Sequence, residues 1–369
     1  MATPSRSTED FRGARERLMG MILITCLTFI VLNVTSVLSY MLSMVSNVLF
    51  ALVVGYNLAD CIDRRYRKEV RLKDPTVFIT GCDSGIGLHA ARRLHEHGFD
   101  VFAGCLDPNS DGAAILKELH VTIVPIDYLE EDSIIHAYKT VTAQLGDRDL
   151  WGIVANAGVV NYGEVEWMSY DEIRWVVNVN LSGTLRFIKE GIPLLRRSRG
   201  RIVVMSGVHG RHAIPGIVAA SAASAGLCSI GDGLRRELCK WHIGVSTIEP
   251  MLYRTRVTEP ENVRIGIMEL LSRVPQSVKD EYGTSYMDAY KSLLPKRLHR
   301  YMHVNLNDIS RAIHCALTDT SPKARYRCGG SDMILALFLE LLPTEVVDTV
   351  INSVFQPRCR VKTVTTKSG

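Results

Sequence analysis

No Asp, Glu, Lys or Arg occurs in the 42 residues from 18 to 59. An uncharged, apolar run of this length is typical of a chain that lies in a lipid bilayer. As one α-helix it would extend about 63 Å, twice the hydrocarbon thickness of roughly 30 Å. The sequence therefore predicts an integral membrane segment, and it favours a transmembrane hairpin of two spans over residues 18–59, divided at the polar stretch 33–39.

Basic residues flank this run on both sides. Arg12, Arg15 and Arg17 precede it, and the basic linker 60–74 carries six Lys and Arg residues. Because basic flanks stay on the cytosolic side, we expect residues 1–17 to be a cytosolic N-terminus and the rest of the chain to face the cytosol too. A single tilted span followed by a hydrophobic linker is the alternative, because no Gly or Pro marks the turn.

The remainder has the composition of a globular protein. The chain is 47% hydrophobic and 22% charged, which excludes a disordered or low-complexity protein. A formal net charge of +4 is too small to indicate a nucleic-acid partner. Nine cysteines, with no Cys-x-x-Cys pair and no Cys/His cluster at zinc spacing, predict reduced thiols and no metal site.

From Pro75 the pattern changes to strand, glycine-rich turn and helix. Residues 76–80 are a short apolar strand, 81–87 are the turn, and the helix that follows ends at Gly98. Strands near 101–105 and 121–127, with a helix near 113–119 between them, continue the alternation. This βαβαβ order predicts an α/β fold with a Rossmann-type, doubly wound parallel sheet.

The turn carries glycines at Gly81, Gly85 and Gly87. This spacing allows a tight turn, a close approach of backbone N–H groups to a pyrophosphate, and close packing of helix on strand. Asp107 lies 20 residues beyond Gly87, where an acid that binds ribose is expected. An ordinary loop Asp before Pro108 is the alternative, and the sequence leaves both open.

Neither residue 84 nor the segment 101–111 contains Lys or Arg. A 2′-phosphate would therefore lack a basic partner, so the sequence favours NAD over NADP.

Ordered motifs over residues 75–350 resemble the short-chain dehydrogenase/reductase family, and within it the membrane-anchored 17β-hydroxysteroid (type 2) and retinol dehydrogenase branch. The motifs are TGCDSGIG (80–87), FAGCL (102–106), Asp127, Asn156-Ala157-Gly158, VNVNLSGT (177–184), GRIVVMSG (200–207), LRREL (234–238), IEP (248–250) and DEYGTSYMDAYK (280–291).

The resemblance implies an NAD(P)-dependent oxidoreductase that acts on a lipophilic alcohol or ketone of steroid or retinoid type. It also implies a place in the endoplasmic reticulum membrane, with lipid as a partner and the soluble domain facing the cytosol. The dehydrogenase domain would span 75–330, with a substrate lid at about 256–300. Apolar C-terminal helices at 331–356 and a basic tail at 357–369 would follow.

The resemblance also implies which residues bind the cofactor. They are Thr80, Gly81, Ser84, Gly85, Ile86, Gly87, Asp107, Asp127, Asn156, Ala157, Gly158, Pro250 and Thr255. Asp127 would hold the adenine, and Pro250 with Thr255 would lie by the nicotinamide. The family's Pro-Gly reads Pro250-Met251 here, and because a methionine lacks the clearance of glycine, we expect altered nicotinamide docking.

The family moves the hydroxyl proton with a Tyr whose pKa is lowered by a Lys four residues later, assisted by a Ser and an Asn. We align this chain with the family's motifs at residues 200–207 and 234–238. The family's Asn is then retained as Asn180, whereas its Ser, Tyr and Lys positions fall on Gly207, Ala220 and Ser224. No Tyr or Lys occurs from 207 to 234. Conventional catalysis is therefore in doubt, and the alternative is a non-catalytic scaffold or regulatory protein that binds a nucleotide or a lipophile.

Replacement groups for the proton carrier are few. His209 and His212 are possible proton carriers. The alternative is that they are ordinary histidines on a solvated loop. Ser221 and Ser224 are expected to carry protons poorly, because no neighbouring base is evident. Tyr253 is expected to pack rather than react. The small residues 219–226 would let their helix pack closely on neighbours or on a second subunit of a homodimer, and they would leave an open pocket.

Overall fold

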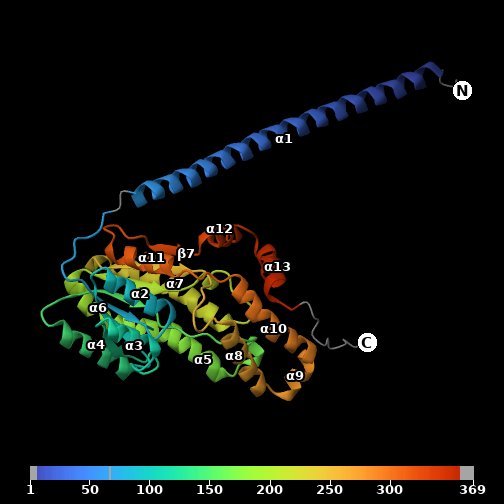
Figure 1. The fold of residues 1–369 in the computed structure, drawn as a ribbon. Coiled ribbons are helices and arrows are strands. Elements are labelled where there is room, and N and C mark those ends of the chain that lie inside the picture. Colours follow the sequence, from blue (N-terminus) through green and yellow to red (C-terminus); the bar gives the residue numbers. More distant parts are fainter. Residues whose placement is uncertain (1–5, 66–67, 358–369) are drawn as a thin grey trace. The chain divides into compact units, whose positions relative to one another are not determined.

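The computed structural model describes residues 6–65 and 68–357. The chain divides into two compact units, residues 1–68 and 69–369 (Figure 1). The first unit contains the helix α1 (Arg6–Arg65), and the second contains the sheet and the other helices. The predicted basic tail lies outside the described residues, apart from Pro357.

α1 is one uninterrupted helix of 60 residues, so the described residues 33–39 do not form the predicted hairpin turn. The side chains of Asn33, Thr35 and Ser36 donate hydrogen bonds to the carbonyl oxygens four residues earlier, at 2.8, 2.9 and 2.8 Å. These polar groups are therefore satisfied within a helix and need no turn. The stretch Met19–Val48 of α1, 30 residues with a mean hydropathy of 2.3, is long and apolar enough to cross a membrane.

The second unit is built on one parallel seven-stranded sheet, in the order β3-β2-β1-β4-β5-β6-β7. The strands are β1 (Thr76–Thr80), β2 (Asp100–Cys105), β3 (Thr122–Pro125), β4 (Leu150–Ala155), β5 (Arg201–Met205), β6 (Gly244–Pro250) and β7 (Arg325–Cys328). The order reverses between β1 and β4, which is where a doubly wound sheet opens a crevice at its carboxyl edge. The predicted α/β fold class is confirmed.

Helices cover both faces of the sheet. One face packs against α2 (Gly85–Glu96), α3 (Asp111–Glu118) and α11 (Asn307–Thr318). The other face packs against α4 (Glu131–Leu145), α6 (Thr184–Ser198) and α7 (Val218–Leu238). Connecting elements are α5 (Tyr170–Val177), the π-helix η2 (Asn178–Gly183) and the 3-10 turns η1 (Val165–Trp167), η3 (Val208–Gly210) and η4 (Cys239–Trp241).

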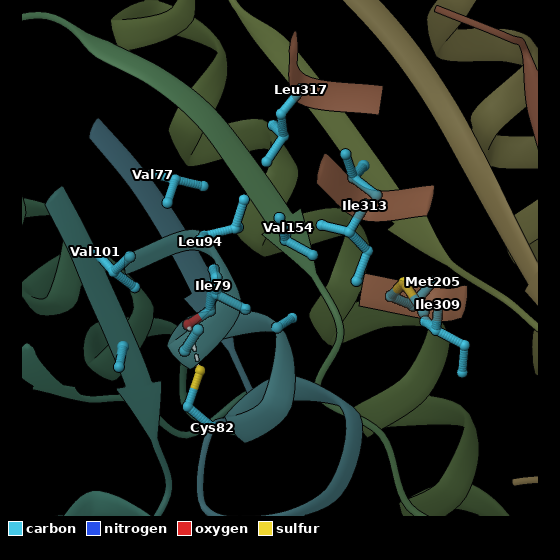
Figure 2. Packing of buried hydrophobic residues seen from close by; sticks show 14 of the residues in the cluster. Val77, Ile79, Cys82, Leu94, Val101, Val154, Met205, Ile309, Ile313 and Leu317 are labelled. Atoms are coloured by element: carbon cyan, nitrogen blue, oxygen red, sulfur yellow. Dashed lines mark hydrogen bonds between the residues drawn. The ribbon is translucent and has the colours of Figure 1, made fainter. Parts of the chain in front are cut away.

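The first of these cores is shown in Figure 2. Val77 and Ile79 of β1 and Val154 of β4 point toward the helices and are fully buried. Ile309, Ile313 and Leu317, four residues apart on α11, meet them with one apolar face. Both faces of the sheet are covered in this way, which explains why β1, β2, β4 and β5 are mostly continuous apolar runs rather than alternating ones.

The remaining helices extend from the carboxyl edge of the sheet. They are α8 (Pro260–Arg273), α9 (Gln276–Tyr282), α10 (Thr284–Arg300), α12 (Gly330–Leu339) and α13 (Thr344–Phe355). α8 to α10 occupy the segment expected to be a lid, and they share an apolar cluster with Trp167, Ile217 and Ala220. α12 is only half-buried, because Met333 and Ala336 face the body whereas Leu335 and Phe338 are exposed.

Met251 packs beneath α12. Its backbone N–H donates to Cys328 O at 2.8 Å, and its side chain joins the small cluster of Val208, Met333 and Ala336. Gly329 makes this position possible, because a Cβ on it would lie 2.1 Å from Met251 Cγ, and its φ of +146° is rare for other residues. The methionine side chain is therefore accommodated by a glycine from the neighbouring strand end.

We expect Gly329→Ala to lower the free energy of unfolding by about 2–4 kcal/mol, since it combines overpacking with an unfavourable φ. Gly330→Ala is the matched control, because its φ is +56° but an added Cβ would meet only His303 Cε1, at 3.9 Å. It should cost about 1 kcal/mol. Thermal unfolding of the detergent-solubilised full chain measures both, and equal losses would contradict the packing. Met251→Gly should relieve part of the Gly329→Ala loss.

Candidate active site

A cavity of about 600 Å³ lies at the carboxyl edge of the sheet. Six strands contribute the residues that follow them to its wall, among them Gly81 after β1, Asp107 after β2 and Asn156 after β4. This is the crevice in which doubly wound sheets bind their ligands.

Most of the residues expected at the site line this cavity. They are Gly81, Ser84, Gly85, Ile86, Asp107, Asp127, Asn156, Ala157, Gly158, Asn180, Ala220, Ser224, Pro250 and Thr255. Thr80, Gly87 and Gly207 do not line it. Met251 does not line it either, because its side chain packs against Gly329, so the structure does not support the expected obstruction of the nicotinamide by Met251.

The glycine-rich turn brings the amino end of α2 to the cavity. Gly81 and Gly85 have φ of +70° and +57°, a region that favours glycine. A Cβ on Gly87 would lie 2.1 Å from Gly81 O, so only glycine lets α2 pack this closely on the turn. Ser84 precedes α2 and makes no side-chain cap, which leaves N–H groups at the helix end to meet an anion.

Thr80 positions the site without touching the cavity. It is fully buried, and its Oγ1 accepts hydrogen bonds from the backbone N–H groups of Asn156 and Ala157 at 3.1 and 3.2 Å. The same oxygen lies 2.7 Å from the hydroxyl of Tyr128, which follows β3. Asn156 Nδ2 in turn donates to Thr80 O at 2.9 Å. One threonine therefore ties together the ends of β1, β3 and β4.

One end of the cavity is acidic. Asp83 accepts hydrogen bonds from the backbone N–H groups of Leu106 and Asp107, at 3.1 and 2.9 Å, and thereby joins the turn to the end of β2. Asp107 accepts from Asn109 N at 2.9 Å, as a loop residue does, and it also lines the cavity. Asp127 lies at the same end.

Arg256, which follows Thr255, is the only Lys or Arg among the described lining residues. The wall near Asp83, Asp107 and Asp127 is therefore rich in carboxylates.

Asn180 lies in the π-helix η2 and faces the segment that follows Gly158. Its Oδ1 accepts from Val159 N at 2.7 Å, and its Nδ2 donates to Val159 O at 2.8 Å. Both polar ends of the amide therefore hold the segment that follows β4. Short π-helical segments of this kind are frequent at functional sites.

Ala220 and Ser224 lie one helical turn apart on α7 and line the cavity together. Ser224 Oγ is 2.8 Å from Nε2 of His209, on η3, so this serine does have a neighbouring imidazole, contrary to expectation. Burial lowers the pKa of His209 to about 4. A Cβ on Gly207 would lie 2.3 Å from His209 Cε1, so the absence of a side chain at 207 makes room for the ring.

The other candidate proton carriers lie elsewhere. His212 Nε2 is 2.9 Å from Ala336 O, so it joins the segment after η3 to α12, and it does not line the cavity. The hydroxyl of Tyr253 donates to Asp308 Oδ2, and its ring is buried, so this residue packs as expected.

The hydroxyls of two tyrosines that line the cavity are also hydrogen-bonded to other groups. Tyr128 bonds with Thr80, and the Tyr162 hydroxyl donates to Val257 O at 3.2 Å. Burial raises the pKa of both phenols, which is the reverse of what a proton-transfer tyrosine requires.

Sequence reasoning missed several residues of the wall. Trp175 of α5, Leu298 of α10 and Met302 also line the cavity, with apolar groups. Their sequence positions carry only helical periodicity, which indicates packing and gives no sign of a shared cavity. The wall is therefore polar at the glycine-rich turn and largely apolar beyond α7.

Comparison with known proteins agrees with this geometry. The family model "short chain dehydrogenase" matches residues 75–265. The chain is 35% identical over 284 residues to 17-beta-hydroxysteroid dehydrogenase type 6 of Bos taurus, covering 76% of this chain and 88% of that protein. It is 32% identical over 293 residues to retinol dehydrogenase 5 of Mus musculus, covering 78% and 91%.

Among solved structures, a short-chain dehydrogenase from Streptomyces avermitilis superposes with a TM-score of 0.60 at 21% identity, covering 76% of this chain and 98% of that one. At that identity the likeness concerns the fold. The family model and the curated relatives together decide the assignment, and the chain belongs to the short-chain dehydrogenase family.

Proposed function

We propose that this protein is a membrane-anchored member of its family that binds NAD together with a lipophilic alcohol or ketone of steroid or retinoid type. One observation carries the proposal: a single cavity joins a glycine-rich turn at one end to an apolar wall at the other. The ligand class follows the names of the relatives, a 17-beta-hydroxysteroid dehydrogenase and a retinol dehydrogenase.

The residues at the polar end fit a dinucleotide. The uncapped amino end of α2 offers backbone N–H groups to a pyrophosphate, and Gly85 leaves this approach open. Asp107 and Asp127 offer carboxylates to ribose and adenine groups and disfavour a 2′-phosphate, which supports NAD over NADP. When bound, the nicotinamide supplies the hydride acceptor or donor.

We further propose that conventional catalysis is impaired. The described lining residues include no Lys, and the hydroxyls of Tyr128 and Tyr162 are held by other partners with their pKa raised. The family's Tyr and Lys positions hold Ala220 and Ser224. Loss of positioned acid–base catalysis costs about 10²–10⁴-fold in rate, so binding without fast turnover is the expected behaviour.

The membrane anchor is proposed to be one span of α1. The apolar stretch of 30 residues would extend about 45 Å, which matches a bilayer with its headgroup regions. Residues 60–74 carry six Lys and Arg, against four in 1–17, which supports a dehydrogenase domain on the cytosolic side; the proposed membrane is that of the endoplasmic reticulum.

A tag at each end of the chain, tested by protease in sealed microsomes, checks this topology. We expect the C-terminal tag to be digested and the N-terminal tag to be protected. Digestion of both tags would favour the hairpin of two spans, and a protected C-terminal tag would contradict a cytosolic domain.

Gly85→Val should reduce NADH affinity at least 100-fold, because a branched side chain would stand where the pyrophosphate lies. Gly98→Val is the matched control for backbone strain, since Gly98 also has a positive φ, +83°, and has open space around it at the other end of α2. Fluorescence of bound NADH measures both variants. Unchanged affinity in a folded Gly85→Val protein would refute the placement of the cofactor.

Introducing the family's catalytic residues should restore dehydrogenase activity. Ala220→Tyr with Ser224→Lys should raise steroid or retinol turnover, and Gly207→Ser should add to the gain. His209 occupies the space these side chains need, so the full gain of about 10²-fold or more requires His209→Ala as well. Initial rates of NADH formation check this against His209→Ala alone. Equal rates in the two proteins, with NADH binding intact, would refute the alignment.

A further inference from the structure

Ser224 and His209 form a hydrogen-bonded pair on the wall of the cavity. They lie 15 residues apart in the chain, and Ser224 Oγ and His209 Nε2 meet at 2.8 Å. Both residues line the cavity, and Asn180 and Ala220 line it with them. The pair is therefore a polar feature in the part of the site where the apolar wall begins.

The loop that carries His209 is held in place by its neighbours. Arg211 donates from Nε and Nη2 to the buried carboxylate of Glu249, at 2.9 and 3.1 Å. A Cβ on Gly210 would lie 2.7 Å from Ser224 C, so the loop rests directly on α7. Ser206 Oγ donates to Ser224 O at 2.9 Å and fixes the same turn of the helix from the end of β5.

The protonation state of the ring decides what the pair can do. Because burial holds the pKa of His209 near 4, the ring is neutral at physiological pH and offers one donor and one acceptor. The imidazolium that proton transfer would require is scarce there, so proton relay is the weaker role. A neutral imidazole and a hydroxyl are well suited to hold an uncharged oxygen atom.

The Ser224 hydroxyl retains hydrogen-bonding capacity beyond His209. It has one proton and two lone pairs, and its bond to the ring uses one of these. If it donates to Nε2 it can accept from an alcohol, and if it accepts from Nε2–H it can donate to a ketone. Ala220, one turn earlier, has only a methyl group and leaves space for the ligand beside the pair.

We propose that Ser224 and His209 together bind the oxygen of the ligand's alcohol or ketone group. The inference rests on the proposed function, which supplies the class of ligand. It assigns the pair to recognition of the ligand: the apolar wall would accept the body of the ligand, and this pair would fix its polar end.

All-trans-retinol and its methyl ether, and a 17β-hydroxysteroid and its 17-methyl ether, are suitable probes for the detergent-solubilised full chain. Quenching of tryptophan fluorescence reports their affinity without turnover. Ser224→Ala should weaken binding of an alcohol probe about three- to tenfold, the value of one hydrogen bond, and leave its ether unaffected. His209→Ala should weaken binding of the same alcohol, and His209→Gln should recover part of the lost affinity.

Ser221→Ala is the matched control. Ser221 lies on the same helix and is also buried. Its hydroxyl has no hydrogen-bond partner among the described residues, and it does not line the cavity. The Ser221→Ala variant should change neither the affinity for the alcohol nor that for its ether. NADH binding, measured in every variant, reports that the fold is intact.

Equal binding of alcohol and ether by the wild type, or equal loss of both in Ser224→Ala, would overturn the inference and leave the proposed function standing. Failure of all four probes to bind, with NADH binding intact, would instead overturn the ligand class, and the inference with it.

Discussion

The site depends on how closely α2 approaches the end of β1. Gly87 has no side chain, and a Cβ there would lie 2.1 Å from Gly81 O, so any other residue would push the helix off the turn. Because α2 sits so close, its amino end faces the cavity. Thr80, at the end of β1, then ties Asn156 and Tyr128 to the same point. The polar end of the cavity is thus a consequence of strand and helix packing that involves no catalytic group.

Small residues shape the opposite end of the cavity. Gly207 leaves the space that the ring of His209 fills, and that ring reaches Ser224 on α7. The two ends can differ in this way because they rest on different elements: α2 and the ends of β1 to β4 hold the polar end, whereas η3 and α7 shape the other. A substitution at one end can therefore leave the packing of the other end unchanged.

Much of the fold could be predicted from sequence because its signals are local. The strand at 76–80, the glycine-rich turn and the following helix are contiguous, and each has its own pattern. The polar stretch with Asn33, Thr35 and Ser36 suggested a turn, but these side chains satisfy their polar groups inside a helix, so the stretch does not require one. The contact of Ser224 with His209 was missed because it depends on how η3 folds back onto α7, which no periodicity encodes. Met251 was expected to alter nicotinamide docking, and its packing against Gly329 could not be foreseen because that glycine lies 78 residues later in the chain.

The central claim is that nucleotide binding is kept while conventional turnover is impaired. Titration of NADH and NADPH into the detergent-solubilised wild type, followed by fluorescence of the bound nicotinamide, tests it directly when paired with rates on a 17β-hydroxysteroid and retinol. The account predicts saturable NADH binding, weaker NADPH binding, and rates about 10²–10⁴-fold below those of a relative with the family's Tyr and Lys. Absence of NADH binding, or turnover as fast as that of such a relative, would contradict it.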